Sequence, residues 1–185
     1  MLPEISLHIL DIVQNSIKAE AKSIHIGIKA DTARDLLCVE IEDDGTGMTQ
    51  EQLQNAMDPF YTTRTTRKTG FGLSFLKYAA EFTGGSFELC SKTGQGTTVT
   101  AVFKLSSINR MPMGSITDTV RLLIASNPQI DFIYSCRMDE RAFTLDTREI
   151  REIMGDIPLD APEIACYLKE YLSENHLEID PQKIL

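Results

Sequence analysis

The chain has 185 residues, of which 42% are hydrophobic and 24% are charged, the composition of an ordinary globular protein. Its formal net charge of −9 disfavours broad binding to nucleic acid, which requires a basic face. The sequence contains no apolar run of about 18 residues and no signal-peptide pattern, so we expect neither a membrane span nor secretion.

The N-terminal pattern is that of an amphipathic helix followed by two strands. Ser6 is placed to cap a helix that runs to about Ala19. Residues 23–29 alternate between apolar and polar, which predicts a strand, and residues 36–42 predict a second strand after a polar turn. The apolar face of the helix would consist of Leu7, Leu10, Val13 and Ile17.

A second set of elements follows these strands. Thr49 and Gln52 form a capping-box pattern for a short helix. Residues 73–82 predict a longer helix that a Gly-Gly pair ends, and residues 87–92 and 97–105 predict a hairpin. This order predicts an α+β fold, a two-layer sandwich with helices on one face of a mixed sheet.

The character of the chain changes after residue 105, where SSINRMPMGS has the composition of a linker. Beyond it we expect helices over 116–125, 150–154 and 162–173, and a hairpin of two strands at 131–136 and 142–145. We therefore divide the chain into a first domain, residues 1–107, and a small α/β region of unknown role, residues 108–185. The second region has enough apolar residues for a core of its own: Val120, Leu122, Leu123, Ile133, Ile150, Ile153, Ile164 and Leu168.

The four cysteines are scattered and form no CxxC pair. Such spacing predicts reduced, mostly buried side chains rather than a disulfide or metal framework. Together with the missing membrane and secretion signals, this predicts a cytoplasmic protein.

Three blocks of residues carry potential chemistry. Asp11, Asn15 and Lys18 share one face of the first helix, although a polar stripe alone is usually a solvated side. The block DDGTGM follows an apolar strand; alone it is also typical of a surface turn, while a calcium loop would need further carboxylates that do not follow. Gly70 and Gly72 open a helix, where backbone N–H groups favour a phosphate.

In this order the blocks resemble the nucleotide site of sensor histidine kinases, DNA gyrase, mismatch-repair ATPases and heat-shock chaperones. This superfamily is called GHKL, and its nucleotide-binding domain is the Bergerat fold. The resemblance implies that the protein binds ATP and Mg²⁺. It implies that Asn15 holds Mg²⁺, that Lys18 lies near the phosphates and that Asp43 accepts a hydrogen bond from the adenine amino group.

The resemblance also implies roles for the remaining residues of the site. Gly45 and Gly47 would let the backbone approach the base, Met48 would pack on its ring, and Thr97 would reach it through a water shared with Asp43. The stretch PFYTTR resembles the F box of sensor kinases, so that Phe60 would anchor a mobile lid. The lid and the glycine block would contact the triphosphate through Arg64, Lys68, Gly70, Phe71, Gly72 and Leu73.

Asp11 is a departure from the kinase pattern. Gyrase-like and mismatch-repair ATPases and anti-sigma-factor kinases carry a Glu four residues before the Mg²⁺-binding Asn. That Glu acts as general base. Histidine kinases usually have Asn at this position. The carboxylate of Asp11 is one methylene shorter. Asp11 is therefore either a catalytic base or a residue without a catalytic role. In the second case it lies on the helix surface or near the ligands of Mg²⁺.

Three functions remain open at this stage. The first is a phosphotransferase that acts in trans on a His or Ser of a partner protein, because none of His8, His25 and His176 has the sequence setting of a phospho-acceptor. The second is an ATPase switch with Asp11 as its base. The third is a regulatory ATP-binding module without chemistry. The sequence also allows a homodimer, and residues 108–185 could bind a partner, dimerise or pack on the sheet.

Overall fold

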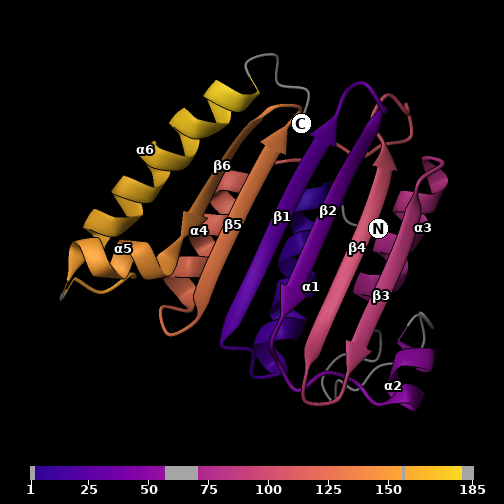
Figure 1. Cartoon of the computed structure of the whole chain (residues 1–185), viewed down its shortest axis with the longest axis horizontal. Coiled ribbons are helices and arrows are strands. Elements are labelled where there is room, and N and C mark those ends of the chain that lie inside the picture. The colour runs from indigo at the N-terminus through magenta and orange to yellow at the C-terminus, as the bar shows by residue number, and fades with distance from the viewer. Residues whose placement is uncertain (1–2, 57–70, 156, 181–185) are drawn as a thin grey trace.

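The computed structural model describes residues 3–56, 71–155 and 157–180. Within these ranges, six strands form one mixed sheet in the order β3-β4-β2-β1-β5-β6 (Figure 1). The strands are β1 (Ser23–Asp31), β2 (Leu36–Asp43), β3 (Ser86–Lys92), β4 (Gly96–Lys104), β5 (Asp131–Met138) and β6 (Arg141–Asp146). The mixed sheet and its helices confirm the predicted α+β class.

The sheet is antiparallel except at one place. β1 pairs with β2, β2 with β4, and β3 with β4, all antiparallel, and β5 and β6 form an antiparallel hairpin. The exception is β5, which lies parallel to β1 with Ile24 opposite Phe132 and Ile26 opposite Tyr134. Residues 108–185 therefore extend the sheet of the first region instead of forming a sheet of their own.

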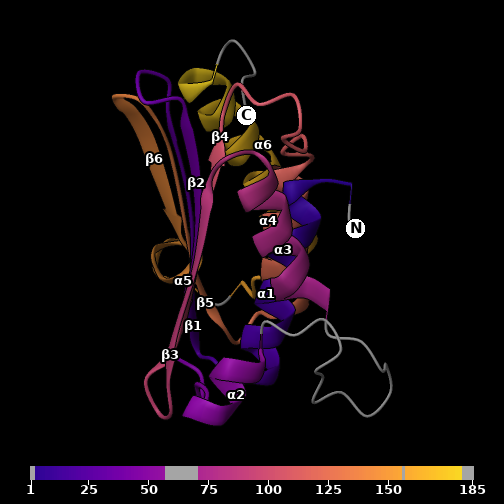
Figure 2. The same cartoon turned by 90° about the vertical axis from the view of Figure 1, so that its right-hand side faces the viewer.

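The longer helices lie on one face of the sheet, as Figure 2 shows. α1 (Ile5–Lys18), α3 (Phe71–Phe82) and α4 (Ile116–Ser126) pack side by side there, and α6 (Pro162–Ile179) covers β5 and β6. α2 (Gln50–Asn55) and α5 (Thr147–Met154) are shorter. Alternate residues of the strands point to the helices, so that Ile24, Ile26 and Ile28 of β1 are buried as the sequence predicts.

One hydrophobic core spans both regions. Residues 108–185 contain enough apolar residues for a core of their own, but their buried side chains join the cluster of the first region instead. Phe132 and Tyr134 of β5 belong to the same cluster of buried residues as Ile26 and Phe103. Leu122 and Ile153, two of the apolar residues counted for such a core, are exposed because α4 and α5 bury other faces. The C-terminal region thus completes the core of the first region.

The start of α1 differs from the prediction. Glu4, not Ser6, is the N-cap residue, and Ser6 is buried inside the helix. The backbone N–H groups of Ile5 and Ser6 donate to the carbonyls of Pro112 and Met113, at 3.0 and 2.8 Å. Because the linker supplies these acceptors, the helix needs no side-chain cap.

The buried face of α1 is also rotated from the predicted one, because the helix packs against both the sheet and its neighbours α3 and α4. Val13 is buried as predicted, whereas Leu7, Leu10 and Ile17 are only partly buried. The residues that reach the core are Ile5, Ile9, Ile12 and Val13, together with the polar residues Ser6, His8 and Ser16.

Other local predictions are confirmed. Thr49 and Gln52 form both hydrogen bonds of the capping box at α2. α3 ends at Phe82, and the N–H of Gly85 donates to the carbonyl of Ala80 at 3.1 Å. None of the described helices is long and apolar enough to cross a membrane.

The cysteines agree with the sequence only in part. All four are free thiols. Of these, Cys136 is buried, but Cys90 and Cys166 are exposed, so the expectation that most are buried is wrong. Spacing in the sequence does not reveal on which face of a strand or helix a single small residue lies.

Candidate functional site

The candidate site lies where β2 ends, between α1, the start of α3 and the turn between β3 and β4. Asp43 is the last residue of β2 and is 8% exposed. Its Oδ2 accepts a hydrogen bond from Ser16 Oγ at 2.6 Å, and its Oδ1 accepts one from the Gly45 N–H at 2.9 Å. A carboxylate has about four acceptor positions, so this geometry fixes Asp43 and leaves capacity for a further donor.

Ser16 is the residue that sequence reasoning missed. It is buried on α1, next to Asn15, and it joins α1 to the end of β2 through the hydrogen bond to Asp43. A hydroxyl on the buried face of a helix needs a partner, which is the signal that could have identified it.

The segment that follows Asp43 is held on two sides. The N–H of Thr46 donates to the carbonyl of Ala19 at 2.8 Å, and the N–H of Gly94 donates to the carbonyl of Thr46 at 2.8 Å. Gly47 has φ +63°, and a Cβ there would overlap the carbonyl oxygen of Lys92. A glycine is therefore required where the β3–β4 turn passes against this segment.

Met48 and Thr97 are joined through Ser91. The N–H of Met48 donates to Ser91 Oγ at 2.9 Å, and the hydroxyls of Ser91 and Thr97 lie 2.8 Å apart. Thr97 is the cross-strand partner of Asp43. Thr98 is the partner of Glu42 and points to the opposite face of the sheet, so the structure brings Thr97 and not Thr98 next to Asp43.

Asp11 lies against the start of α3. A Cβ at Gly72 would overlap Oδ2 of Asp11 and would lie 3.1 Å from its Cγ. Glycine at this position therefore lets the carboxylate reach the helix N-terminus, where the helix dipole favours negative charge. Asp11 and Gly72, which come from two separate motifs, are thus neighbours.

The other predicted residues of α1 and α3 lie at the same end of the molecule. Asn15 is half-buried one turn after Asp11, and Lys18 is exposed. Leu73 is partly buried and packs against the core. Phe60, Arg64, Lys68 and Gly70 lie outside the described residues, as does the side chain of Phe71.

The described residues contain no cluster of three or more His, Cys, Asp or Glu side chains that could hold a metal ion. Asn15 offers a neutral amide oxygen beside the position of Asp11. That oxygen suits Mg²⁺, which binds through few protein ligands and completes its shell with water and phosphate oxygens. The donor set of this site therefore fits Mg²⁺ that arrives with a phosphate ligand.

Comparison with known proteins agrees with this geometry. Residues 4–107 match the family model described as histidine kinase-, DNA gyrase B-, and HSP90-like ATPase. The chain is 32% identical over 90 residues to a probable C4-dicarboxylate sensor kinase of Bacillus subtilis (strain 168), which covers 49% of this chain and 16% of the relative. It is 26% identical over 106 residues to the sensor histidine kinase ZraS of Escherichia coli (strain K12), which covers 57% of this chain and 23% of the relative.

A solved structure shares the fold. The N-terminal domain of a DNA repair protein superposes with a TM-score of 0.55 at 17% identity, over 84% of this chain and 58% of that chain. The chain thus spans less than a quarter of the two sensor kinases and just over half of this structure. At that identity the solved structure shows a common fold alone.

Proposed function

The chain belongs to the histidine kinase-, DNA gyrase B- and HSP90-like ATPase family, and from this premise we propose that it binds Mg²⁺·ATP and transfers the γ-phosphate to a partner protein. ATP binding is the part that family membership supports directly. The observation that carries the proposal is the fixed, buried carboxylate of Asp43 next to the helix that bears Asn15.

The adenine would bind at Asp43. The two hydrogen bonds from Ser16 and Gly45 hold the carboxylate in one orientation, so that a free lone pair accepts the exocyclic N–H of the base. A guanine presents a carbonyl at that position and would leave the buried carboxylate without a donor, which costs free energy. Met48 and Thr97 would line the same end of the pocket.

The phosphates would bind between Asn15 and the N-terminus of α3. The positive end of the α3 helix dipole favours anions there. When bound, Mg²⁺ neutralises phosphate charge and orients the γ-phosphate. Asn15 would hold the ion, and the exposed Lys18 would add a positive charge at the edge of the site.

The phospho-acceptor would lie outside this sequence. All three histidines are described, and none of them is exposed. His8 is fully buried, His25 Nε2 bonds Ser135 Oγ at 2.8 Å, and His176 Nε2 bonds the Tyr134 hydroxyl at 2.8 Å. An acceptor must meet the γ-phosphate, so a side chain of a partner fits better than any of these.

The contact between Asp11 and Gly72 favours a second candidate, hydrolysis of ATP without a protein acceptor. It places a carboxylate at the helix terminus where the γ-phosphate would lie. A carboxylate there is positioned to accept a proton from an attacking water. The chain would then be an ATP-driven switch.

The binding part is tested by isothermal calorimetry with Mg²⁺·ATP. We expect Asp43→Asn to weaken binding by about 10- to 100-fold, or roughly 1.4–2.7 kcal/mol. Asp44→Asn is the matched control, because among the described residues Asp44 accepts the N–H groups of Lys22 and Ser23 through Oδ1, which an asparagine oxygen can replace. Equal affinities of the two variants would remove Asp43 from the site.

The chemical step is tested by single-turnover incubation with γ-labelled Mg²⁺·ATP. Release of free phosphate by the wild-type chain, lost in Asp11→Asn, would establish the ATPase. Bound but unreacted nucleotide, with label transferred after a candidate partner is added, would establish the phosphotransferase. Acid-labile label then indicates His, and acid-stable label indicates Ser.

A further inference from the structure

Three polar residues form one row across the end of the sheet at the candidate site. Ser91 of β3 lies opposite Thr97 of β4, and Thr97 lies opposite Asp43 of β2. Directly opposite residues of antiparallel strands have Cβ atoms about 4.5–5.5 Å apart. The next row on the same face belongs to the core or packs against it: Leu89, Val99 and Ile41. The polar row therefore lies on the face of the sheet that the helices cover.

Ser91 makes three contacts through a single oxygen. Its Oγ accepts the N–H of Met48 at 2.9 Å and donates to the carbonyl of Gly96 at 3.0 Å. The same Oγ lies 2.8 Å from Oγ1 of Thr97. One hydroxyl thus joins β3, β4 and the segment that follows β2.

The contact with Ser91 determines where the Thr97 hydroxyl lies. A threonine side chain rotates between staggered χ1 positions. The hydrogen bond at 2.8 Å stabilises the position that brings Oγ1 to Ser91, whichever of the two hydroxyls is the donor. Because Thr97 lies opposite Asp43, this hydroxyl belongs to the surface that a base bound at Asp43 would meet.

The backbone of Met48 is held on both sides by the same hairpin. Its N–H donates to Ser91 Oγ at 2.9 Å, and its carbonyl accepts from Thr93 Oγ1 at 3.2 Å. Met48 is half-buried, so the loss of the Ser91 oxygen would take an acceptor from a partly desolvated N–H, which costs free energy. Ser91 therefore fixes a second residue at the same end of the site.

We propose that Ser91 is a positioning residue for the base of the nucleotide: its hydroxyl fixes Thr97 Oγ1 and the backbone of Met48 at the end of the site that Asp43 forms. This inference rests on the proposed binding of ATP. Ser91 acts through its two neighbours and needs no contact with the ligand. The phosphates would bind elsewhere, between Asn15 and the start of α3, so Ser91 affects the affinity for the base and not the affinity for the phosphates.

The test is isothermal calorimetry of the full chain with two ligands in the presence of Mg²⁺. One is ATP, and the other is ribose 5-triphosphate, which has the sugar and phosphates of ATP but no base. Ser91→Ala should weaken ATP binding about tenfold and change the affinity for ribose 5-triphosphate by less than about twofold. A general loss of structure would instead lower both affinities alike and would overturn the proposal.

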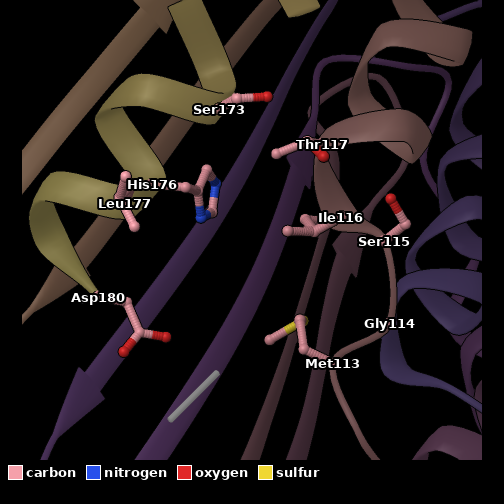
Figure 3. Close-up of a pocket in the computed structure, with 9 residues that line it drawn as sticks. All are labelled: Met113, Gly114, Ser115, Ile116, Thr117, Ser173, His176, Leu177 and Asp180. Atoms are coloured by element: carbon pink, nitrogen blue, oxygen red, sulfur yellow. The ribbon is translucent and has the colours of Figure 1, made fainter. Parts of the chain in front are cut away.

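Two other serines are matched controls for this substitution. Ser86→Ala changes an exposed residue at the other end of β3. Ser173→Ala changes an exposed residue of α6 that lines a separate pocket of about 520 Å³ between α4 and α6 (Figure 3). Met113, in the wall of that pocket, accepts the N–H of Ser6 in the first turn of α1, whereas Asn15 lies in the last turn. Both controls should bind ATP as the wild type does.

A double variant tests whether Ser91 acts through Thr97. Thr97→Val removes the hydroxyl and keeps the branched shape of the side chain. In this background Ser91→Ala should weaken ATP binding by no more than about threefold, because the hydroxyl that it positions is already absent. A second tenfold loss would show that the two residues act independently.

The nucleotide-free chain supplies a further measurement. In ¹⁵N-labelled protein, Ser91→Ala should shift the amide resonance of Met48, whose N–H loses its acceptor, and Ser86→Ala should not. A wild-type chain that does not bind Mg²⁺·ATP would overturn the proposed function itself. A wild-type chain that binds it, with equal affinity in Ser91→Ala, would overturn only the role of Ser91.

Discussion

The strands on the two sides of β1 differ in what their residues must do: β3, β4 and β2 lie on one side, and β5 and β6 lie on the other. On one side, Asp43 at the end of β2, Gly47 in the segment that follows it and Thr97 of β4 lie at the candidate nucleotide site. On the other side, β5 and β6 contribute Phe132 and Tyr134 to the core and continue the sheet from β1. A ligand restricts residue types at single positions, whereas a core restricts only where apolar residues lie, so a sequence motif marks the first side alone.

The first side also depends on the second. β1 has a partner on each edge, β2 and β5, over most of its length. Without β5 its backbone groups and buried isoleucines would face water on one edge, which is costly. The linker carbonyls that accept from the N–H groups of Ile5 and Ser6 add a second connection.

The largest expected effect tests whether the two sides share one core. Phe103→Ala on β4 and Phe132→Ala on β5 should each destabilise the chain by about 3–5 kcal/mol, because both side chains are fully buried in the same cluster. Thermal unfolding followed by circular dichroism should show one transition that both variants lower. Two transitions, each lowered by only one variant, would mean two separate cores.

The next effect concerns the contact between α1 and α3. Gly72→Ala should destabilise the chain by about 1–3 kcal/mol, because its Cβ overlaps the Asp11 carboxylate. Gly27→Ala is the control, since a Cβ there has no neighbour closer than 3.5 Å. In urea unfolding, Asp11→Ala should relieve the effect in the double variant, with a coupling of roughly 0.5–3 kcal/mol. If the loss of unfolding free energy in the double variant equals the sum of the losses in the two single variants, the two side chains are not in contact.

A smaller effect is expected at Ser16. Ser16→Ala should weaken ATP binding about tenfold, or roughly 1.4 kcal/mol, because Asp43 loses the donor that orients Oδ2. Ser6→Ala is the matched control, a buried serine on the same helix whose hydroxyl bonds Glu4 instead. Calorimetry that finds the same affinity for both variants would make Ser16 a residue of the fold only.

The smallest expected effect is a pH dependence of the stability, which comes from His176 on the second side. Burial lowers the pKa of His176, while the nearby Asp180 partly opposes this. Because the pKa of His176 is lower in the folded chain than in the unfolded chain, the unfolded chain binds a proton at this ring more readily. The stability that the neutral ring contributes is therefore complete above about pH 6.5 and is lost as the pH falls through the lower pKa of the folded state. Urea midpoints between pH 7.5 and 5 should fall less in His176→Gln than in the wild type. Urea midpoints that fall by the same amount in both proteins would contradict the role of His176 in this pH dependence.

Much of the local structure could be predicted from the sequence. The capping box at Thr49, the isoleucine face of β1 and the end of α3 before Gly84 depend on neighbouring residues, and the structure confirms them. The residue types of the three blocks and of the stretch PFYTTR were also sufficient to indicate the family that residues 4–107 match.

The tertiary structure decided the features that join distant segments. The cap of α1 comes from the linker rather than from Ser6, and the buried face of α1 is set by the sheet and two other helices. The hydrogen bond from Ser16 to Asp43 and the contact of Asp11 with Gly72 each join residues far apart in sequence.

By itself, the sequence determined which segments are helices and strands and which residue types could bind a nucleotide, because hydrophobic period, caps and turns act over a few residues. It did not determine that β5 would lie parallel to β1 and merge two expected units into one core. Pairing between segments about a hundred residues apart depends on the packing of whole faces. That packing exists only once the chain has folded.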